Sequence, residues 1–144
     1  MIKNKRQLKY TQRRLHKLEK GLEEIRKKYA TDKKKANLLS QGYKEHIAQL
    51  KSEIAEFESM KKKPLPKMLW IHDLNEVSHQ LVRLRIARKL TQAQLAARIE
   101  CKQSDISRLE REDYSGHTLG QLKKIVTNLN AELGIVLIPK TPRH

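Results

Sequence analysis

Residues 84–110 have the sequence LRIARKLTQAQLAARIECKQSDISRLE, and its spacing predicts two short helices joined by a tight connection. Thr91 is a favourable N-cap for the first helix, because its hydroxyl can accept a hydrogen bond from a free backbone N–H. Three apolar residues of that helix recur at helical spacing, namely Leu95, Ala96 and Ile99. The first helix is therefore expected to bury this face.

The second helix is expected over residues 103–112, after a connection formed by residues 100–102. Its apolar side carries Ile106 and Leu109, which are three residues apart. The other side offers short or forked hydrogen-bonding groups suited to base edges and phosphates. These groups belong to Gln103, Ser104, Ser107 and Arg108. The pattern predicts a helix-turn-helix whose second helix fits a DNA major groove.

The segments LTQAQLA and QSDISRLE resemble the Cro/C1-type, or XRE, helix-turn-helix family over about residues 81–129. The resemblance implies a lambda-repressor-like, five-helix DNA-binding domain. It also implies that Gln92 contacts a phosphate and that the start of the second helix contacts DNA bases. The expected DNA-binding residues are Gln92, Lys102, Gln103, Ser104, Ser107 and Arg108.

Two further expectations come from the same resemblance. Glu100 stands where the family usually has a left-handed glycine, so a slightly different turn is expected, with a negative charge near DNA. Arg85 and Glu110 match positions that often pair beneath the helix-turn-helix. A guanidinium can meet a carboxylate in two parallel hydrogen bonds, so we expect a buried structural ion pair.

The composition favours a polyanionic partner. The 144 residues include 32 Lys plus Arg and 16 Asp plus Glu, a net charge of +16, and the pI is about 10.1. The single cysteine, Cys101, rules out an internal disulfide and fits a reducing cytoplasm. No apolar run approaches the length of a membrane span or of a signal-peptide core. We therefore expect a cytoplasmic, nucleoid-associated protein with no membrane partner.

Nothing in the sequence indicates an enzyme. The six histidines are scattered, and none has a His, Cys or paired carboxylate nearby at metal-ligand spacing. The chain has five glycines and no glycine-rich phosphate loop. We expect no catalytic residue, no metal site and no cofactor.

The N-terminal part is organised differently and carries most of the charge. Residues 1–68 contain 20 basic and 8 acidic residues, whereas residues 69–144 contain 12 and 8. Two apolar series follow heptad-like spacing: Leu8, Leu15, Leu18, Leu22, Ile25 and Tyr29, then Leu39, Tyr43, Ile47, Leu50, Ile54 and Phe57. They predict an antiparallel, coiled-coil-like helical hairpin, with Thr31 or Asp32 capping its second helix.

Helix-breaking residues set the expected boundaries. The hairpin covers residues 1–63, and the proline-containing segment 64–70 is the linker. The DNA-binding domain then covers residues 71–139, and residues 140–144 form a tail.

Capping patterns predict two further helices in this domain. Asp73 and Glu76 form a capping-box pattern before one helix, and Thr118 and Gln121 form another. Asn130 can end the last helix in a left-handed conformation. The inward residues are expected to be Leu74, Val77, Leu81 and Leu84, then Leu119, Leu122, Ile125, Val126 and Leu129.

Residues 132–138, ELGIVLI, predict one short β-strand that ends at Pro139. A lone strand leaves backbone groups unpaired, so it needs a partner. The partner is either residues 68–71 or a second copy of the chain, and we favour the second copy. The expected dimerisation residues are Leu133, Ile135, Val136 and Leu137. A strand after the last helix also resembles HigA-type antitoxins.

The sequence therefore predicts a mainly α, sequence-specific regulator of transcription that acts on double-stranded DNA as a dimeric repressor. An alternative is the antitoxin of a type II toxin–antitoxin pair, which binds a protein toxin and regulates its own operon. A third possibility is a structural or RNA-binding role of the basic hairpin. The N-terminal MIKNKRQ resembles the start of some XRE regulators and implies no agreed role.

Overall fold

The computed structural model describes residues 1–142, and this range contains six α-helices and one short 3-10 helix. The chain divides into two compact units. The first unit comprises Met1–Trp70 with Val82–Thr91, and the second comprises Ile71–Leu81 with the residues from Gln92 onward.

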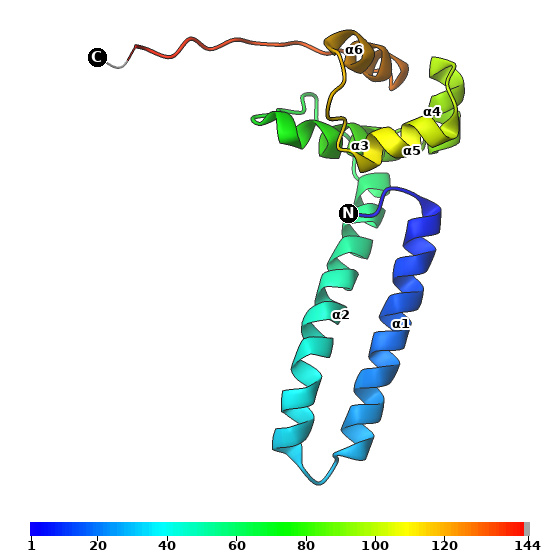
Figure 1. Cartoon of the computed structure of the whole chain (residues 1–144), viewed down its shortest axis with the longest axis vertical. Helices are drawn as coiled ribbons and strands as arrows, with labels where there is room; N and C mark the ends of the chain where they lie inside the picture. The colour runs from blue at the N-terminus through cyan, green and yellow to red at the C-terminus, as the bar shows by residue number, and fades with distance from the viewer. Residues whose placement is uncertain (143–144) are drawn as a thin grey trace. The chain divides into compact units, whose positions relative to one another are not determined.

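Two long helices dominate the first unit. Helix α1 (Lys5–Lys28) and helix α2 (Lys33–Lys62) pack side by side and run antiparallel (Figure 1). Asn4 and Asp32 are their N-caps, and each side chain accepts the backbone N–H three residues later, at 2.9 and 3.1 Å. The expected cap at Asp32 is confirmed.

The apolar series of the two helices are mostly buried or half-buried, with one exception. Leu39 is exposed, contrary to expectation. The neighbouring Ser40 is buried instead, and its hydroxyl donates to the carbonyl of Ala36 in the turn before it. A strict alternation of three and four residues leads back from Tyr43 to Ser40, so Ser40 rather than Leu39 continues the inward series.

Gly21 of α1 packs against the side chain of Tyr43 on α2. A Cβ at this position would lie 2.7 Å from Cε1 of Tyr43 on α2. By contrast, a Cβ at Gly42 would meet no atom within 4 Å. Gly21 is thus explained by packing, whereas Gly42 is not.

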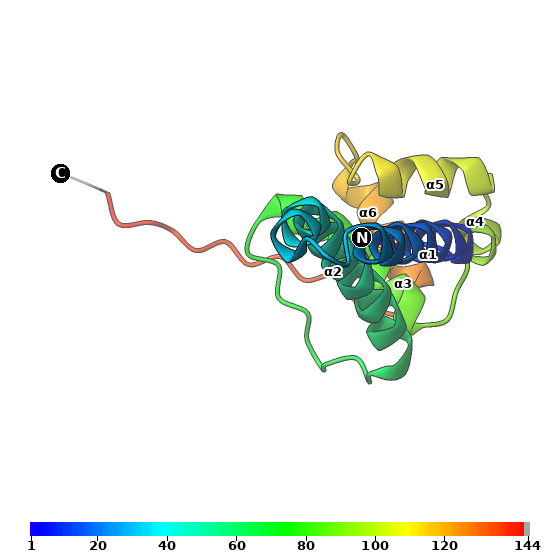
Figure 2. The same cartoon turned by 90° about the horizontal axis from the view of Figure 1, so that it is seen from below.

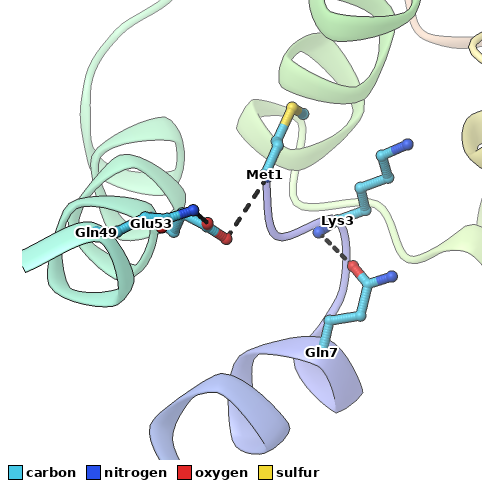
Figure 3. Close-up of polar contacts among 5 residues, drawn as sticks. All are labelled: Met1, Lys3, Gln7, Gln49 and Glu53. Atoms are coloured by element: carbon cyan, nitrogen blue, oxygen red, sulfur yellow. Dashed lines mark hydrogen bonds and ion pairs between the residues drawn. The ribbon is translucent and has the colours of Figure 1, made fainter. Parts of the chain in front are cut away.

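The N-terminal residues attach to both helices of this unit (Figure 3). The amino nitrogen of Met1 lies 3.6 Å from Oε2 of Glu53 on α2. The backbone N–H of Lys3 donates to Oε1 of Gln7 on α1 at 2.7 Å. Ile2 between them is buried and forms part of the core of this unit.

The remaining elements belong to the predicted DNA-binding domain. They are η1 (Leu74–Glu76), α3 (Val77–Ala87), α4 (Gln92–Ile99), α5 (Gln103–Arg111) and α6 (Leu119–Asn128). Within the second unit, α4 packs against both α5 and α6. The expected five-helix domain therefore has four α-helices and one 3-10 turn in the described residues.

The core of the second unit is formed by the inward faces of α4, α5 and α6. Its buried apolar residues are Leu95, Ala96, Ile99, Ile106, Tyr114, Ile125, Val126 and Leu129. The expected burial of Leu95, Ala96, Ile99 and Ile106 is confirmed. The expected burial of Leu74 and Leu119 is wrong, because these residues are 85% and 63% exposed. Each is the first residue of its helix and lies before the turn that packs.

The last helix begins and ends as its sequence predicts. Thr118 Oγ1 accepts the backbone N–H of Gln121 at 3.2 Å, and Gln121 Oε1 accepts that of Thr118 at 3.1 Å. After the helix, Asn130 has a φ of 56°. Both the capping box and the left-handed end are confirmed.

The capping box expected at Asp73 forms differently. Asp73 Oδ1 accepts the backbone N–H of Asn75, two residues on, and Glu76 Oε2 accepts that of His72. The reciprocal pair is therefore absent here, because this segment begins with a tight 3-10 turn rather than an α-helical one.

The predicted C-terminal strand is wrong for this chain by itself. Residues 129–142 contain no strand, and the segment extends away from α6 (Figures 1 and 2). Ile135, Val136, Leu137 and Ile138 are 60–87% exposed. A strand needs a neighbouring backbone to complete its hydrogen bonds, and residues 68–71 do not supply one. Of the expected tail, residues 143–144 lie outside the described range.

Candidate nucleic-acid interface

The turn between α4 and α5 has the geometry of a glycine turn without a glycine. Glu100 has a φ of 59°, and the backbone N–H of Cys101 donates to the carbonyl of Ala96 at 3.0 Å. This hydrogen bond closes the end of α4 as a Schellman motif does. The expectation that Glu100 changes the turn is therefore wrong, since glutamate adopts the left-handed conformation itself.

The start of α5 is stabilised by an acidic residue in its first turn. The backbone N–H of Lys102, the N-cap, donates to Oδ2 of Asp105 at 3.1 Å. A carboxylate at this end also complements the positive pole of the helix. Nη2 of Arg108 lies 3.5 Å from Oδ1 of Asp105. The Arg108 side chain is mostly exposed, so its guanidinium faces solvent on α5.

The expected base-contacting residues occupy one face of α5. Gln103, Ser104 and Arg108 are exposed, and Ser107 is half-buried. Ile106 on the opposite side is fully buried. Lys102 is also exposed, directly before the helix. The structure thus brings the predicted α5 residues together on a solvent-facing polar surface.

Gln92 lies in a buried chain of hydrogen bonds. Its side chain is 6% exposed, and its Nε2 donates to Oε2 of Glu110, which is 0% exposed, at 2.7 Å. Its Oε1 accepts from Nε2 of Gln103 at 3.2 Å. Residue spacing did not predict this series of hydrogen bonds. The only indication in the sequence was that a glutamine and a glutamate stand among the apolar positions of α4 and α5.

The hydrogen bond from Gln103 to Gln92 fixes the amide of Gln103 at the start of α5. One N–H of Gln103 is used in the bond to Gln92, which leaves the second N–H and the oxygen. Those two groups form the pattern that pairs with the N7 and N6 positions of adenine in the major groove. Gln103 is therefore chemically equipped for a bidentate base contact while Gln92 holds it in place.

Arg85 and Glu110 are both buried charges, as the sequence predicted. Nη1 of Arg85 donates to the carbonyl of Leu90 at 2.8 Å, and Nη2 donates to the carbonyl of Lys3 at 2.5 Å. Glu110 accepts from Gln92. A buried charge is tolerated only where such partners satisfy it. The pairing of Arg85 with Glu110 stays a prediction.

Arg98 connects the helix-turn-helix to the last helix. Its Nη1 donates to the carbonyl of Asn128 at 3.1 Å, near the C-terminal end of α6. A cation is favourable at this end of a helix, because the last carbonyl groups carry partial negative charge. The contact holds α4 and α6 together at the surface of the second unit.

The thiol of Cys101 lies in the turn between α4 and α5. Burial raises the pKa of this thiol, the nearby Asp105 carboxylate raises it further, and Lys124 lowers it. The thiol is therefore protonated at neutral pH, and a protonated thiol is a poor nucleophile.

The described residues contain neither a metal-binding cluster nor a membrane-spanning helix. Within residues 1–142, no three His, Cys, Asp or Glu side chains lie together in a way that could hold a metal ion. In the same range, every helix is too short or too polar to cross a bilayer.

Part of the chain matches a known protein family. Residues 81–135 match the helix-turn-helix family, and this range contains α4, α5 and α6. The matched family is one of DNA-binding domains. The match supports a regulator of the XRE type. No curated protein and no solved structure matches the chain.

Proposed function

We propose that this protein is a dimeric repressor that recognises a specific duplex sequence through α5. The observation that carries the proposal is the exposed polar face of α5, whose opposite side is fixed in the core by Ile106. On this view phosphate contacts supply much of the affinity, and the side chains of α5 supply the choice of sequence.

Each residue of the interface has a distinct role in this proposal. Gln103 and Arg108 contact base edges, because an amide and a guanidinium can each form two hydrogen bonds to one base. Ser104 and Ser107 add single hydrogen bonds. Gln92 donates its second N–H to a phosphate while its first N–H holds Glu110. Lys102 contacts the DNA backbone.

The test begins by selecting bound duplexes from a random pool to obtain a preferred site. Gln103→Ala should then weaken binding to that site by about 1–3 kcal/mol, while binding to a random duplex changes much less. Gln12→Ala is the matched control, since Gln12 is an exposed glutamine on α1. An unchanged ratio of specific to non-specific affinity in Gln103→Ala would refute the proposed docking.

We propose that dimerisation uses the C-terminal segment. Its exposed apolar residues, Leu133 to a lesser degree and then Ile135, Val136 and Leu137, lack backbone partners within the described chain. Two copies paired antiparallel would complete these hydrogen bonds and bury both apolar faces. The DNA site should then be an inverted repeat with half-sites about 34 Å apart.

Sedimentation of the full chain and of a chain lacking residues 132–144 tests the dimer. The full chain should be a dimer and the shortened chain a monomer with much weaker DNA binding. A shortened chain that stays dimeric would place the interface elsewhere.

The exposed segment 135–138 also favours the second candidate, an antitoxin. In that case the segment binds a protein toxin, and DNA binding regulates the operon. A monomeric full chain that forms a stable complex with the product of an adjacent gene would support the antitoxin. Retention of that complex after deletion of residues 132–144 would exclude this segment as the toxin-binding site.

A further inference from the structure

Helix α1 carries a row of five exposed cations, which we call the α1 cationic stripe: Arg6, Lys9, Arg13, Lys17 and Lys20. Their spacing of three, four, four and three residues places them along one side of an α-helix. The stripe is part of the first unit and is separate from the polar face of α5.

The packed side of α1 is distinct from the stripe. Leu8 and Thr11 are buried, and Leu15, Leu18 and Leu22 are half-buried in the helix that packs against α2. These residues also recur every three or four positions, but they are out of phase with the stripe. The cations therefore project away from α2 and take no part in holding the hairpin together.

The charge of the stripe is not neutralised by acids on the same helix. The first acidic residue of the chain is Glu19, and its Oε1 lies 3.0 Å from Nζ of Lys51 on α2. The first turn of α1 contains no acid, and Lys5 and Arg6 lie there instead. The ion pairs found among residues 1–142 include no member of the stripe.

This arrangement works against the stability of the isolated helix. Cations near the N-terminus of a helix oppose its dipole, and cations three or four residues apart repel one another. A helix selected only for solubility would gain from acids in these positions. The pattern is explained if a polyanion supplies the missing negative charge.

We propose that the α1 cationic stripe binds the phosphate backbone of the duplex DNA that α5 recognises. This inference rests on the proposed function for the identity of the DNA. From Arg6 to Lys20 the stripe extends about 21 Å along α1, at 1.5 Å per residue. A DNA strand carries one phosphate per about 3.4 Å of axis, so such a length presents about six phosphates to the five cations.

The chemistry of the stripe favours a duplex over the other polyanions. Single-stranded nucleic acids are bound through aromatic residues that stack on bases. The stripe itself contains no aromatic residue, and the exposed Tyr10 beside it already has the guanidinium of Arg14 over its ring, 5.9 Å from the centroid. An anionic membrane is bound by helices with an exposed apolar face, whereas the apolar face of α1 packs against α2. The stripe offers charge alone, which is the recognition that a phosphate backbone needs.

The experiment compares two variants of the full chain that each lose five positive charges. The first changes Arg6, Lys9, Arg13, Lys17 and Lys20 to Gln. The control changes Lys33, Lys34, Lys35, Lys44 and Lys62 on α2, all exposed, to Gln. Glutamine is a good helix former, and far-ultraviolet circular dichroism establishes that both variants keep the helical content of the parent.

Dissociation constants for a random-sequence duplex are measured over a range of salt concentrations. The slope of the logarithm of the dissociation constant against the logarithm of the salt concentration should become smaller by about 0.9 for each phosphate that the variant no longer binds. The slope should fall by about 2–4 in the stripe variant and by less than about 1 in the control. An unchanged slope in the stripe variant would overturn the proposal, as would an equal fall in both variants, which would indicate a general effect of net charge.

The same measurements separate this inference from the proposed function. Absence of sequence preference in the parent protein, with a reduced slope in the stripe variant, would support the stripe and refute repression at a specific site. Conversely, a stripe variant that keeps its duplex slope but has a lower affinity for single-stranded RNA or for anionic vesicles would assign the stripe to that other partner and overturn the proposal.

Discussion

The contrast between Gly21 and Gly42 makes a sharp test of the hairpin. Replacing glycine by alanine inside a helix stabilises it by about 1 kcal/mol when nothing opposes the new methyl group. Gly42 meets that condition, because no atom lies within 4 Å of the added Cβ. Gly42→Ala should therefore raise the free energy of unfolding by about 1 kcal/mol.

Gly21→Ala should lower the free energy of unfolding or leave it unchanged. Its methyl group would lie 2.7 Å from Cε1 and 3.4 Å from Cζ of Tyr43, well inside contact distance. Overpacking of this kind costs about 1–3 kcal/mol, which offsets the helical gain. The net change should lie between zero and about 2 kcal/mol of destabilisation, so the two variants should differ by about 1–3 kcal/mol.

Urea unfolding followed by circular dichroism at 222 nm measures both variants. A third variant removes the obstacle: in a Tyr43→Ala background, Gly21→Ala should stabilise by about as much as Gly42→Ala does in the parent. Equal stabilisation by Gly21→Ala and Gly42→Ala in the parent chain would show that α1 and α2 do not approach at this point.

Three further outcomes concern the helix-turn-helix. Glu100→Gly should raise the melting temperature, because it removes a left-handed conformation that costs an L-residue about 1 kcal/mol; a lower value would refute the turn described. Cys101 should react with iodoacetamide at pH 8 more slowly than free cysteine, since its raised pKa leaves little thiolate, and Asp105→Asn should speed the reaction. A rate equal to that of free cysteine would contradict this. Glu110→Ala should cost about 3–5 kcal/mol in urea unfolding if Glu110 pairs with Arg85 in the core, and an unchanged midpoint would exclude the pair.

Local features of the protein were predictable from sequence where their causes are local. The capping box of Thr118 and Gln121 involves residues three positions apart, so it formed as its pattern predicts. The same holds for Asp32 at the start of α2 and for the left-handed Asn130 after α6. In each case the chain satisfies its own backbone within one turn, whatever surrounds it.

Features that depend on a neighbouring element needed the structure. Leu39 is apolar but exposed, because the three-four alternation of the α2 series places the polar Ser40 inward in its stead. Leu74 and Leu119 have core-like side chains but lie at helix starts that nothing covers. Hydrophobicity gives the preference of a residue for burial, whereas packing decides whether a partner surface is there to meet it.

The candidate interface shows the same division. Periodicity alone placed Gln103, Ser104 and Arg108 on one side of a helix opposite Ile106, because an α-helix repeats every 3.6 residues. It did not reveal that Gln92 is buried and holds Gln103 while donating to Glu110. These hydrogen bonds join residues from two helices, so they depend on how α4 and α5 cross.

Whether the C-terminal segment pairs as a strand could not be decided from the sequence. Its alternation of apolar residues predicts a strand, and its residues are extended and exposed as a strand requires before pairing. A helix completes its hydrogen bonds within its own sequence, so the helices of this protein could be located from residue patterns. A strand completes them with another backbone, so only tertiary structure could decide that residues 132–138 have no partner within the described chain.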